Sequence, residues 1–121
     1  MSIKFTNDKP IFLQLAEIIK GQIISGKMTA NEKLPSVREF GLLYAINPNT
    51  VQKALQILED DGLIFTDRTN GKYVSDSSST IELEKNNLIK NELNLFVEKM
   101  KSLGLNKEEL KKLINNIGDE K

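Results

Sequence analysis

Two short stretches of the sequence carry polar side chains whose types and spacing suit hydrogen bonding to nucleic acid. The first holds Ser36 and Arg38, and the second reads Asn-Pro-Asn-Thr-Val-Gln-Lys over residues 47–53. Asn and Gln can bond adenine at two points, Thr can pack on a thymine methyl, and Lys can reach guanine or a phosphate. These contacts need side chains that project from one exposed surface. Whether the two stretches can bind nucleic acid therefore depends on the helices and strands that hold these side chains.

The composition gives little support to catalysis. The chain has no cysteine and no histidine, which removes disulfides, thiolate zinc sites, cysteine nucleophiles and the imidazole of most acid–base chemistry. An enzyme hypothesis would have to rest on the carboxylates Glu59, Asp60 and Asp61, which precede Gly62. A solvated helix end explains them more simply, so we expect no enzymatic activity, no metal site and no cofactor.

Length and hydropathy limit the architecture. A chain of 121 residues suffices for one domain and a small appendage, without room for a large ligand-binding domain. No apolar run approaches the ~20 residues needed to cross a bilayer, and no secretory leader is evident, which predicts a cytoplasmic protein without a membrane partner. The 17 basic and 17 acidic residues cancel, which argues mildly against a broad basic binding surface.

Helix signals come first in the chain. A helix is expected from Pro10, placed at the first helical position, to Ser25 and Gly26. The next begins at Ser36, which forms a capping box with Glu39 three residues later. The expected buried face of this second helix comprises Val37, Phe40, Leu43 and Tyr44. Arg38 then lies in the exposed first turn, where the helix terminus favours a phosphate.

A third helix has the strongest start signal, Asn47 as N-cap followed by Pro48. Val51, Ala54, Leu55 and Leu58 form its apolar stripe, and Gly62 is available as C-terminal cap. The remaining faces carry Asn49, Thr50, Gln52, Lys53 and Gln56. Polar residues face solvent on any amphipathic helix, so this pattern alone does not decide between solvation and base contact.

A β-hairpin is expected directly after the third helix. Residues 63–67 and 72–75 are β-prone, and Asn70-Gly71 between them supplies the positive φ angles of a tight turn. Arg68 and Lys72 flank that turn and could reach a backbone or minor groove. Helix, turn, helix and hairpin in this order predict a winged helix-turn-helix, a mainly α fold with a small β-hairpin (α+β).

Residues 10–74 resemble the N-terminal winged helix-turn-helix of the GntR superfamily of bacterial transcription regulators. The resemblance rests on segment order and on the elements Leu-Pro-Ser-Val-Arg-Glu at residues 34–39 and Leu-Glu-Asp-Asp-Gly-Leu-Ile at residues 58–64. The Asn-Pro-Asn-Thr-Val turn at residues 47–51, with a short tail in place of a large effector domain, resembles the small YtrA-type subfamily. The resemblance implies DNA-facing positions at Ser36, Arg38, Asn49, Thr50, Gln52, Lys53 and Gly71.

A composition break separates this region from the tail. Residues 76–80 are small and polar and are expected as a linker between a DNA-binding domain at 1–75 and a helical dimerisation hairpin at 81–121. One long helix should span roughly 81–103, followed after Gly104 by a short helix that Asn106 caps with Glu109. The expected dimerisation surface comprises Leu88, Ile89, Leu93, Phe96, Met100, Leu103, Leu110, Leu113, Ile114 and Ile117.

The tail carries more apolar surface than two helices can bury between themselves. It could fold back onto the winged domain, or two copies could pack into a four-helix interface. The dimer is favoured because twofold symmetry would set two recognition helices about one DNA turn apart and require a pseudo-palindromic operator. The YtrA-type resemblance implies the same arrangement. A small effector, if one exists, would have to bind at that interface or between domains.

These observations together predict a homodimeric regulator of transcription that binds double-stranded DNA, most simply as a repressor. The residues expected at the DNA are Ser36, Arg38, Asn47, Asn49, Thr50, Gln52, Lys53, Arg68, Asn70, Gly71 and Lys72. The alternative is a winged-helix adaptor that docks a protein through the same polar face without binding DNA, and the zero net charge is its main support.

Overall fold

The computed structural model describes residues 4–118, which form five helices and one antiparallel hairpin. The elements are α1 (Ile11–Ile24), α2 (Val37–Tyr44), α3 (Pro48–Asp60), β1 (Ile64–Asp67), β2 (Gly71–Val74), α4 (Ser78–Ser102) and α5 (Lys107–Asn116). The mainly helical fold class with one hairpin is thereby confirmed. Pro10 is the N-cap of α1 rather than its first helical residue, a shift of one position.

The chain divides into two units, Met1–Lys85 and Asn86–Lys121, which are described separately. The expected linker at residues 76–80 is wrong, because α4 already begins at Ser78. The Ser77 hydroxyl accepts a hydrogen bond from the Thr80 backbone N–H at 3.3 Å. Small hydroxyl residues favour helix starts for this reason, so the polar stretch that resembled a flexible spacer is the start of a helix.

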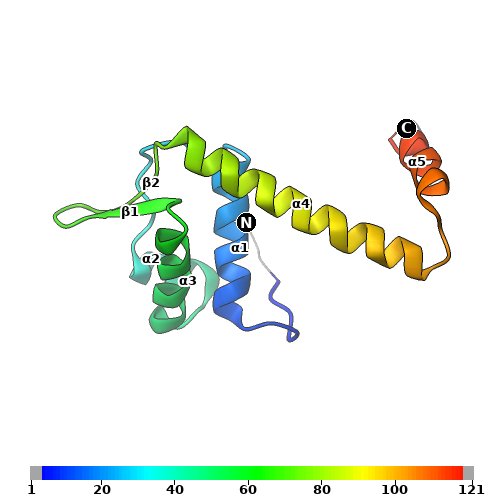
Figure 1. Cartoon of the computed structure of the whole chain (residues 1–121). Helices are drawn as coiled ribbons and strands as arrows, with labels where there is room; N and C mark the ends of the chain where they lie inside the picture. The colour runs from blue at the N-terminus through cyan, green and yellow to red at the C-terminus, as the bar shows by residue number, and fades with distance from the viewer. Residues whose placement is uncertain (1–3, 119–121) are drawn as a thin grey trace. The chain divides into compact units, whose positions relative to one another are not determined.

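The core of the first unit lies where α1 and α3 pack together, with the hairpin projecting beside them (Figure 1). The predicted stripe of α3 is confirmed, since Val51, Ala54, Leu55 and Leu58 are all fully buried. The other buried apolar residues of this core are Leu15, Ala16, Ile19, Ile23, Leu34, Phe40, Leu63, Ile64 and Val74.

The buried face of α2 is narrower than expected. Phe40 is its one buried residue, with Val37 and Tyr44 packed partly against the core, whereas Leu43 is 64% exposed. At 100° per residue, Val37 and Tyr44 lie on one side of Phe40 and Leu43 lies on the other. The Tyr44 ring stacks on Phe40 at 6.1 Å, so the helix leans on the core through that side only.

A strand-like segment precedes α2 where the sequence indicated only a polar turn. Asn31 N–H donates to the Val74 carbonyl at 2.9 Å, Val74 N–H to the Glu32 carbonyl at 2.9 Å, and Leu34 N–H to the Lys72 carbonyl at 2.8 Å. Lys33 thereby forms an isolated β-bridge with Tyr73. Together with its pairing to β1, these bonds hold β2 on both edges, and they tie the hairpin to the segment before α2.

The hairpin turn is longer than the tight Asn-Gly turn that was expected. In the register, Asp67 pairs with Gly71, so Arg68, Thr69 and Asn70 form the loop. Gly71 has φ +111°, whereas Asn70 is not among the described non-glycine residues with positive φ. The Asp67 carboxylate instead holds the loop by accepting the Thr69 N–H at 3.0 Å and the Thr69 hydroxyl at 2.8 Å.

The second unit contains the rest of α4 together with α5. Asn106 and Glu109 form the predicted capping box at the start of α5, at 2.8 and 3.0 Å. Among the described residues of this unit, Leu110 alone is buried. Most of the expected dimerisation surface is exposed, namely Ile89, Leu93, Phe96, Leu103, Leu113, Ile114 and Ile117, while Leu88 and Met100 are half-buried.

Candidate nucleic-acid interface

The first turn of α3 presents a small set of polar side chains. Asn49 and Gln52 are exposed, and Thr50 is half-buried. Asn47 has a different role, because its Oδ1 accepts the Asn49 backbone N–H at 2.8 Å as the cap of the helix. Lys53 is exposed, with its Nζ lying 5.6 Å from the centroid of the Phe12 ring on α1. Asn49 and Gln52 therefore have the amides most available to a base edge.

The start of α2 combines a closed capping box with an unpaired cation. The Ser36 hydroxyl accepts the Glu39 N–H at 3.1 Å, and the Ser36 N–H donates to Glu39 Oε1 at 2.9 Å. The backbone bond from Ser36 lowers the pKa of the Glu39 carboxyl, and the Ser36 side chain adds to the effect. Within the described part of the chain Arg38 is exposed and makes no ion pair. Its charge at a helix N-terminus suits a phosphate.

The turn between α2 and α3 is held close by Gly41. Ala45 adopts the left-handed conformation at φ +54°, and the Ile46 N–H donates to the Gly41 carbonyl at 3.0 Å. A Cβ added to Gly41 would lie 2.9 Å from the Ile46 carbonyl oxygen. The sequence reasoning missed this residue, although glycine inside a short helix, where it costs about 1 kcal/mol relative to alanine, was the available signal.

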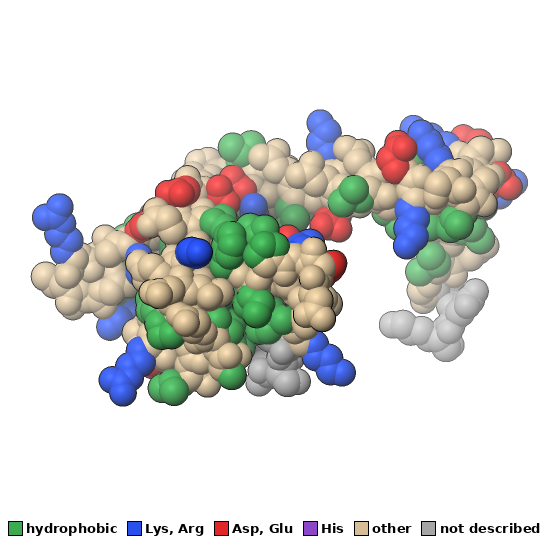
Figure 2. All heavy atoms as spheres, turned by 90° about the horizontal axis from the view of Figure 1, so that it is seen from below, with side chains coloured by type: hydrophobic (Ala, Val, Ile, Leu, Met, Phe, Trp, Pro, Cys, Tyr) green, Lys and Arg blue, Asp and Glu red, His purple; other side chains and the backbone are tan. Residues whose placement is uncertain are grey.

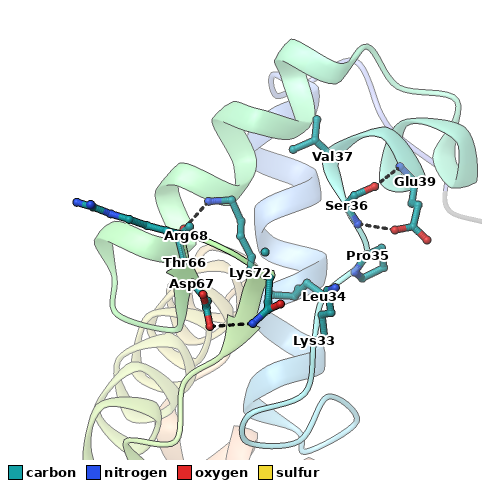
Figure 3. A pocket seen from close by; sticks show the side chains of 12 residues that line it. Lys33, Leu34, Pro35, Ser36, Val37, Glu39, Thr66, Asp67, Arg68 and Lys72 are labelled. Atoms are coloured by element: carbon teal, nitrogen blue, oxygen red, sulfur yellow. Dashed lines mark hydrogen bonds between the residues drawn. The ribbon is translucent and has the colours of Figure 1, made fainter.

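A groove of about 350 Å³ separates the start of α2 from the hairpin (Figure 3). Residues 33–37 and Glu39 line one side, and residues 66–68 and 70–72 line the other. Arg68 extends outward from the hairpin, whereas Lys72 turns toward Thr66 (Figure 3). Lys33 lines the groove as a cation that the sequence reasoning missed, because its pairing with β2 depends on contacts distant in sequence.

The hairpin residues expected at DNA have different surroundings. The pKa of Asp67 is lowered by hydrogen bonds from neighbouring residues. The largest effect comes from the Thr69 backbone N–H, followed by the Thr69 hydroxyl and the Asn70 side chain. Asn70 is thus partly engaged in holding its own loop, with its Nδ2 donating to Asp67 at 3.4 Å. Gly71 brings β2 close to Lys33, whose Cε would lie 3.4 Å from a Cβ at position 71. Lys72 faces Glu59, with Nζ and Oε2 3.7 Å apart.

The distribution of charge shows how phosphates could be contacted. On the face drawn in Figure 2, lysine and arginine side chains are scattered, in places beside acidic side chains, and hydrophobic side chains gather between some of them. Such a surface can contact phosphates through separate cations rather than through one continuous basic patch. None of the helices in the described part of the chain has the length and hydropathy that a bilayer span requires.

Comparison with known proteins places this geometry in a family. The profile of the family described as "Bacterial regulatory proteins, gntR family" matches residues 12–74. The chain is 36% identical over 110 residues, 91% of each protein, to the uncharacterized HTH-type transcriptional regulator YhcF of Bacillus subtilis. It is 37% identical over 109 residues, 89% of this chain and 84% of the relative, to the HTH-type transcriptional repressor YtrA of the same species.

Solved structures agree with the sequence matches. A GntR family transcriptional regulator from Listeria monocytogenes superposes with a TM-score of 0.87 at 34% identity, covering 93% of this chain and 99% of the other. The AraR DNA-binding domain in complex with operator ORR3 matches 62% of this chain and 88% of its own length, with a TM-score of 0.54 at 25% identity. The winged helix-turn-helix, the profile match and these relatives together show that the chain belongs to the GntR family of DNA-binding transcription regulators, a family of regulators rather than enzymes.

Proposed function

We propose that this protein is a homodimeric repressor that binds a pseudo-palindromic operator through the start of α3, the start of α2 and the hairpin. The observation that carries the proposal is the exposure of Arg38, Asn49 and Gln52 at two adjoining helix starts. The apolar residues of α3 are buried beneath them, so these polar groups cannot turn inward. Asn and Gln supply bidentate readout of adenine, and Arg38 supplies a phosphate contact.

The hairpin contributes a second contact in this proposal. Arg68 stands in its loop with no ion pair among the described residues, and Lys33, on the segment before α2, lines the same groove. Two cations that line one groove suit a sugar–phosphate backbone that passes between the hairpin and α2. With so few phosphate contacts, the affinity should depend only shallowly on salt, each contact adding about 0.9 to the log–log slope.

The homodimer is supported by the apolar surface of the second unit. Many of its leucine, isoleucine and phenylalanine side chains are exposed, as for Ile89 (52%) and Leu93 (54%), whereas Leu110 is buried. Exposed apolar side chains that recur along helices in this way are typical of an interface. The repressor activity of YtrA supports the sign of regulation, and a chromosomal operator would place the protein in the cytoplasm.

The test is fluorescence anisotropy of the protein with a labelled duplex from upstream of its own gene, against a shuffled duplex, over a salt series. Tight, selective binding with two protomers per site is expected. Asn49→Ala should cost about 1–3 kcal/mol per half-site on the selected duplex and relax specificity at one base pair of each half-site.

Gln56→Ala provides the matched control for that test. Gln56 is exposed on the same helix, but its amide is bound to Asp60 at 2.9 Å, one turn further on. Its loss should leave the affinity within about twofold, since side chains outside the readout set contribute little. The proposal would be contradicted if the affinity were weak, equal for both duplexes and unchanged by Asn49→Ala. That result would favour a protein-docking adaptor.

A further inference from the structure

The acidic end of α3 has no explanation in DNA binding. Carboxylates near a helix C-terminus are slightly unfavourable because they face the negative end of the helix dipole. Each nevertheless has a partner, since Asp60 accepts from Gln56 and Asp61 lies 3.8 Å from Lys20 on α1. The third, Glu59, faces the hairpin. This end of α3 is therefore a set of side-chain contacts to neighbouring groups rather than a merely solvated terminus.

The contact of Glu59 runs through two hairpin residues. The Thr66 hydroxyl donates to Glu59 Oε1 and accepts from Lys72 Nζ at 2.8 Å. Lys72 Nζ also lies 3.7 Å from Glu59 Oε2, and the two side chains are only 19% and 28% exposed. Thr66 and Lys72 are register partners on β1 and β2, so both strands are joined to α3 on one face of the hairpin.

We propose that Lys72 is a positioning residue, which fixes the hairpin against the C-terminal half of α3, and not a phosphate ligand. The proposal rests on the proposed function, because it assigns a role within that DNA-binding surface. It also revises the expectation from the sequence, which placed Lys72 and Arg68 together at the DNA. To reach a phosphate, the Lys72 ammonium would have to leave both Thr66 and a carboxylate of opposite charge.

Arg68 provides the contrast within the same hairpin. It is exposed, extends away from Lys72 and has no ion pair among the described residues (Figure 3). Counterions are released only by cations that neutralise phosphates, so the salt slope of binding separates the two roles. Removing one phosphate contact lowers the slope by about 0.9, so losing the same ligand from both protomers of the dimer lowers it by about 1.8. Removing a positioning residue lowers affinity at every salt concentration and leaves the slope unchanged.

The experiment compares Lys72→Met with Arg68→Met, which each remove one cation from each protomer. Operator binding over a salt series should show an unchanged slope for Lys72→Met and a slope lowered by about 1.8 for Arg68→Met, about 0.9 for each of the two protomers. Amide hydrogen exchange of the hairpin is measured without DNA on the same full-length variants. Exchange in β1 and β2 should be about two- to fivefold faster in Lys72→Met, as expected for loss of a partly exposed ion pair, and unchanged in Arg68→Met.

Glu59→Gln breaks the same contact without removing a cation. It should accelerate amide hydrogen exchange of the hairpin to a similar extent. In the double variant with Lys72→Met, the exchange should be little faster than in either single variant. The inference is overturned if Lys72→Met lowers the slope as Arg68→Met does, or if hairpin exchange is unchanged in both Lys72→Met and Glu59→Gln. Failure of the wild-type protein to bind the duplex would contradict the proposed function alone, because the exchange measurements still decide the role of Lys72.

Discussion

Gly41 has only a hydrogen atom as its side chain, and this lets the turn between α2 and α3 pass close to the α2 backbone. Gly41→Ala would bring a Cβ to 2.9 Å from the Ile46 carbonyl oxygen, which is backbone and cannot rotate away. We expect a loss of about 1–3 kcal/mol in the free energy of unfolding, as for other overpacked sites. Operator affinity should fall as well, since the start of α3 must shift. Urea denaturation and anisotropy measure the two effects.

Gly21 supplies the matched control for this substitution. It lies inside α1, and a Cβ added there would meet nothing within 4 Å. Gly21→Ala should therefore stabilise the protein by about 0.5–1 kcal/mol, because alanine loses less conformational freedom in a helix. If both substitutions change stability in the same direction, the close approach at Gly41 is not what determines the effect.

Residues of one type have different roles at neighbouring positions, and this is where sequence reasoning about the site reaches its limit. Asn47 and Asn49 are both polar residues at a helix start, yet the side chain of Asn47 caps the helix while that of Asn49 is exposed. The capping role followed from the Asn-Pro pair, because capping is local. The engagement of Lys72 by Glu59 could not be predicted, because those residues meet only after the hairpin folds back on α3.

At the scale of elements, capping residues in the sequence predicted where helices begin. The spacing of apolar residues was a less accurate guide to which helix faces are buried. The capping boxes at Ser36 and Asn106 and the glycine end of α3 are all confirmed. The exposure of Leu43 was missed, because an eight-residue helix can lean on the core from either side of Phe40. The pairing of residues 31–34 with β2 was missed for the related reason that a lone strand-like segment has no periodicity to read.

The capping box of α2 predicts a dependence of stability on acid. Hydrogen bonds from Ser36 lower the pKa of Glu39 in the folded protein. The stabilisation is therefore complete above the ordinary pKa of a glutamate and is lost as the pH falls through the lower, folded value. Urea denaturation between about pH 6 and pH 3 should show this loss in the wild-type protein.

Glu39→Gln is the control for that acid dependence. Glutamine can still accept the Ser36 N–H in a capping box but does not titrate. The variant should therefore lose less stability than the wild-type protein over the same pH range, although other carboxylates will contribute equally to both. Ser36→Ala should cost about 1 kcal/mol at neutral pH and only reduce the pH-dependent difference, because the backbone N–H of residue 36, the larger cause of the lowered pKa, still donates to Glu39. Identical acid profiles for wild type and Glu39→Gln would show that the box does not act through this charge.

At the scale of the whole molecule, the sequence indicated that the tail needs a partner and favoured a second copy of the chain over the winged domain. The excess of apolar residues over residues 81–121 was evident from their helical spacing. In the described part of the second unit that surface is largely uncovered, with Leu110 alone buried. A second copy of the same chain is the partner under our proposal, since a twofold arrangement would also supply two recognition helices to one operator.

That assembly predicts opposite behaviour for two substitutions on α4 that introduce the same charge. Leu93 lies in the apolar stripe and is 54% exposed, while Asn91 is exposed and points away from the stripe by nearly half a turn. Leu93→Glu should weaken the dimer by at least about 100-fold, because a carboxylate buried at an interface lacks a partner. Asn91→Glu should leave the dimer intact in sedimentation equilibrium.

The same pair of variants connects assembly with operator binding. Without the dimer, the second half-site loses the effective concentration that the first contact provides, which costs about 10²- to 10⁴-fold in affinity. Leu93→Glu should therefore bind the full operator no better than a half-site, whereas Asn91→Glu should bind as the wild-type protein does. Far-ultraviolet circular dichroism should be unchanged in both, because neither side chain is buried in the single chain. A Leu93→Glu protein that stays dimeric would mean that the two copies meet through another surface, or that the apolar stripe of the tail serves a different partner.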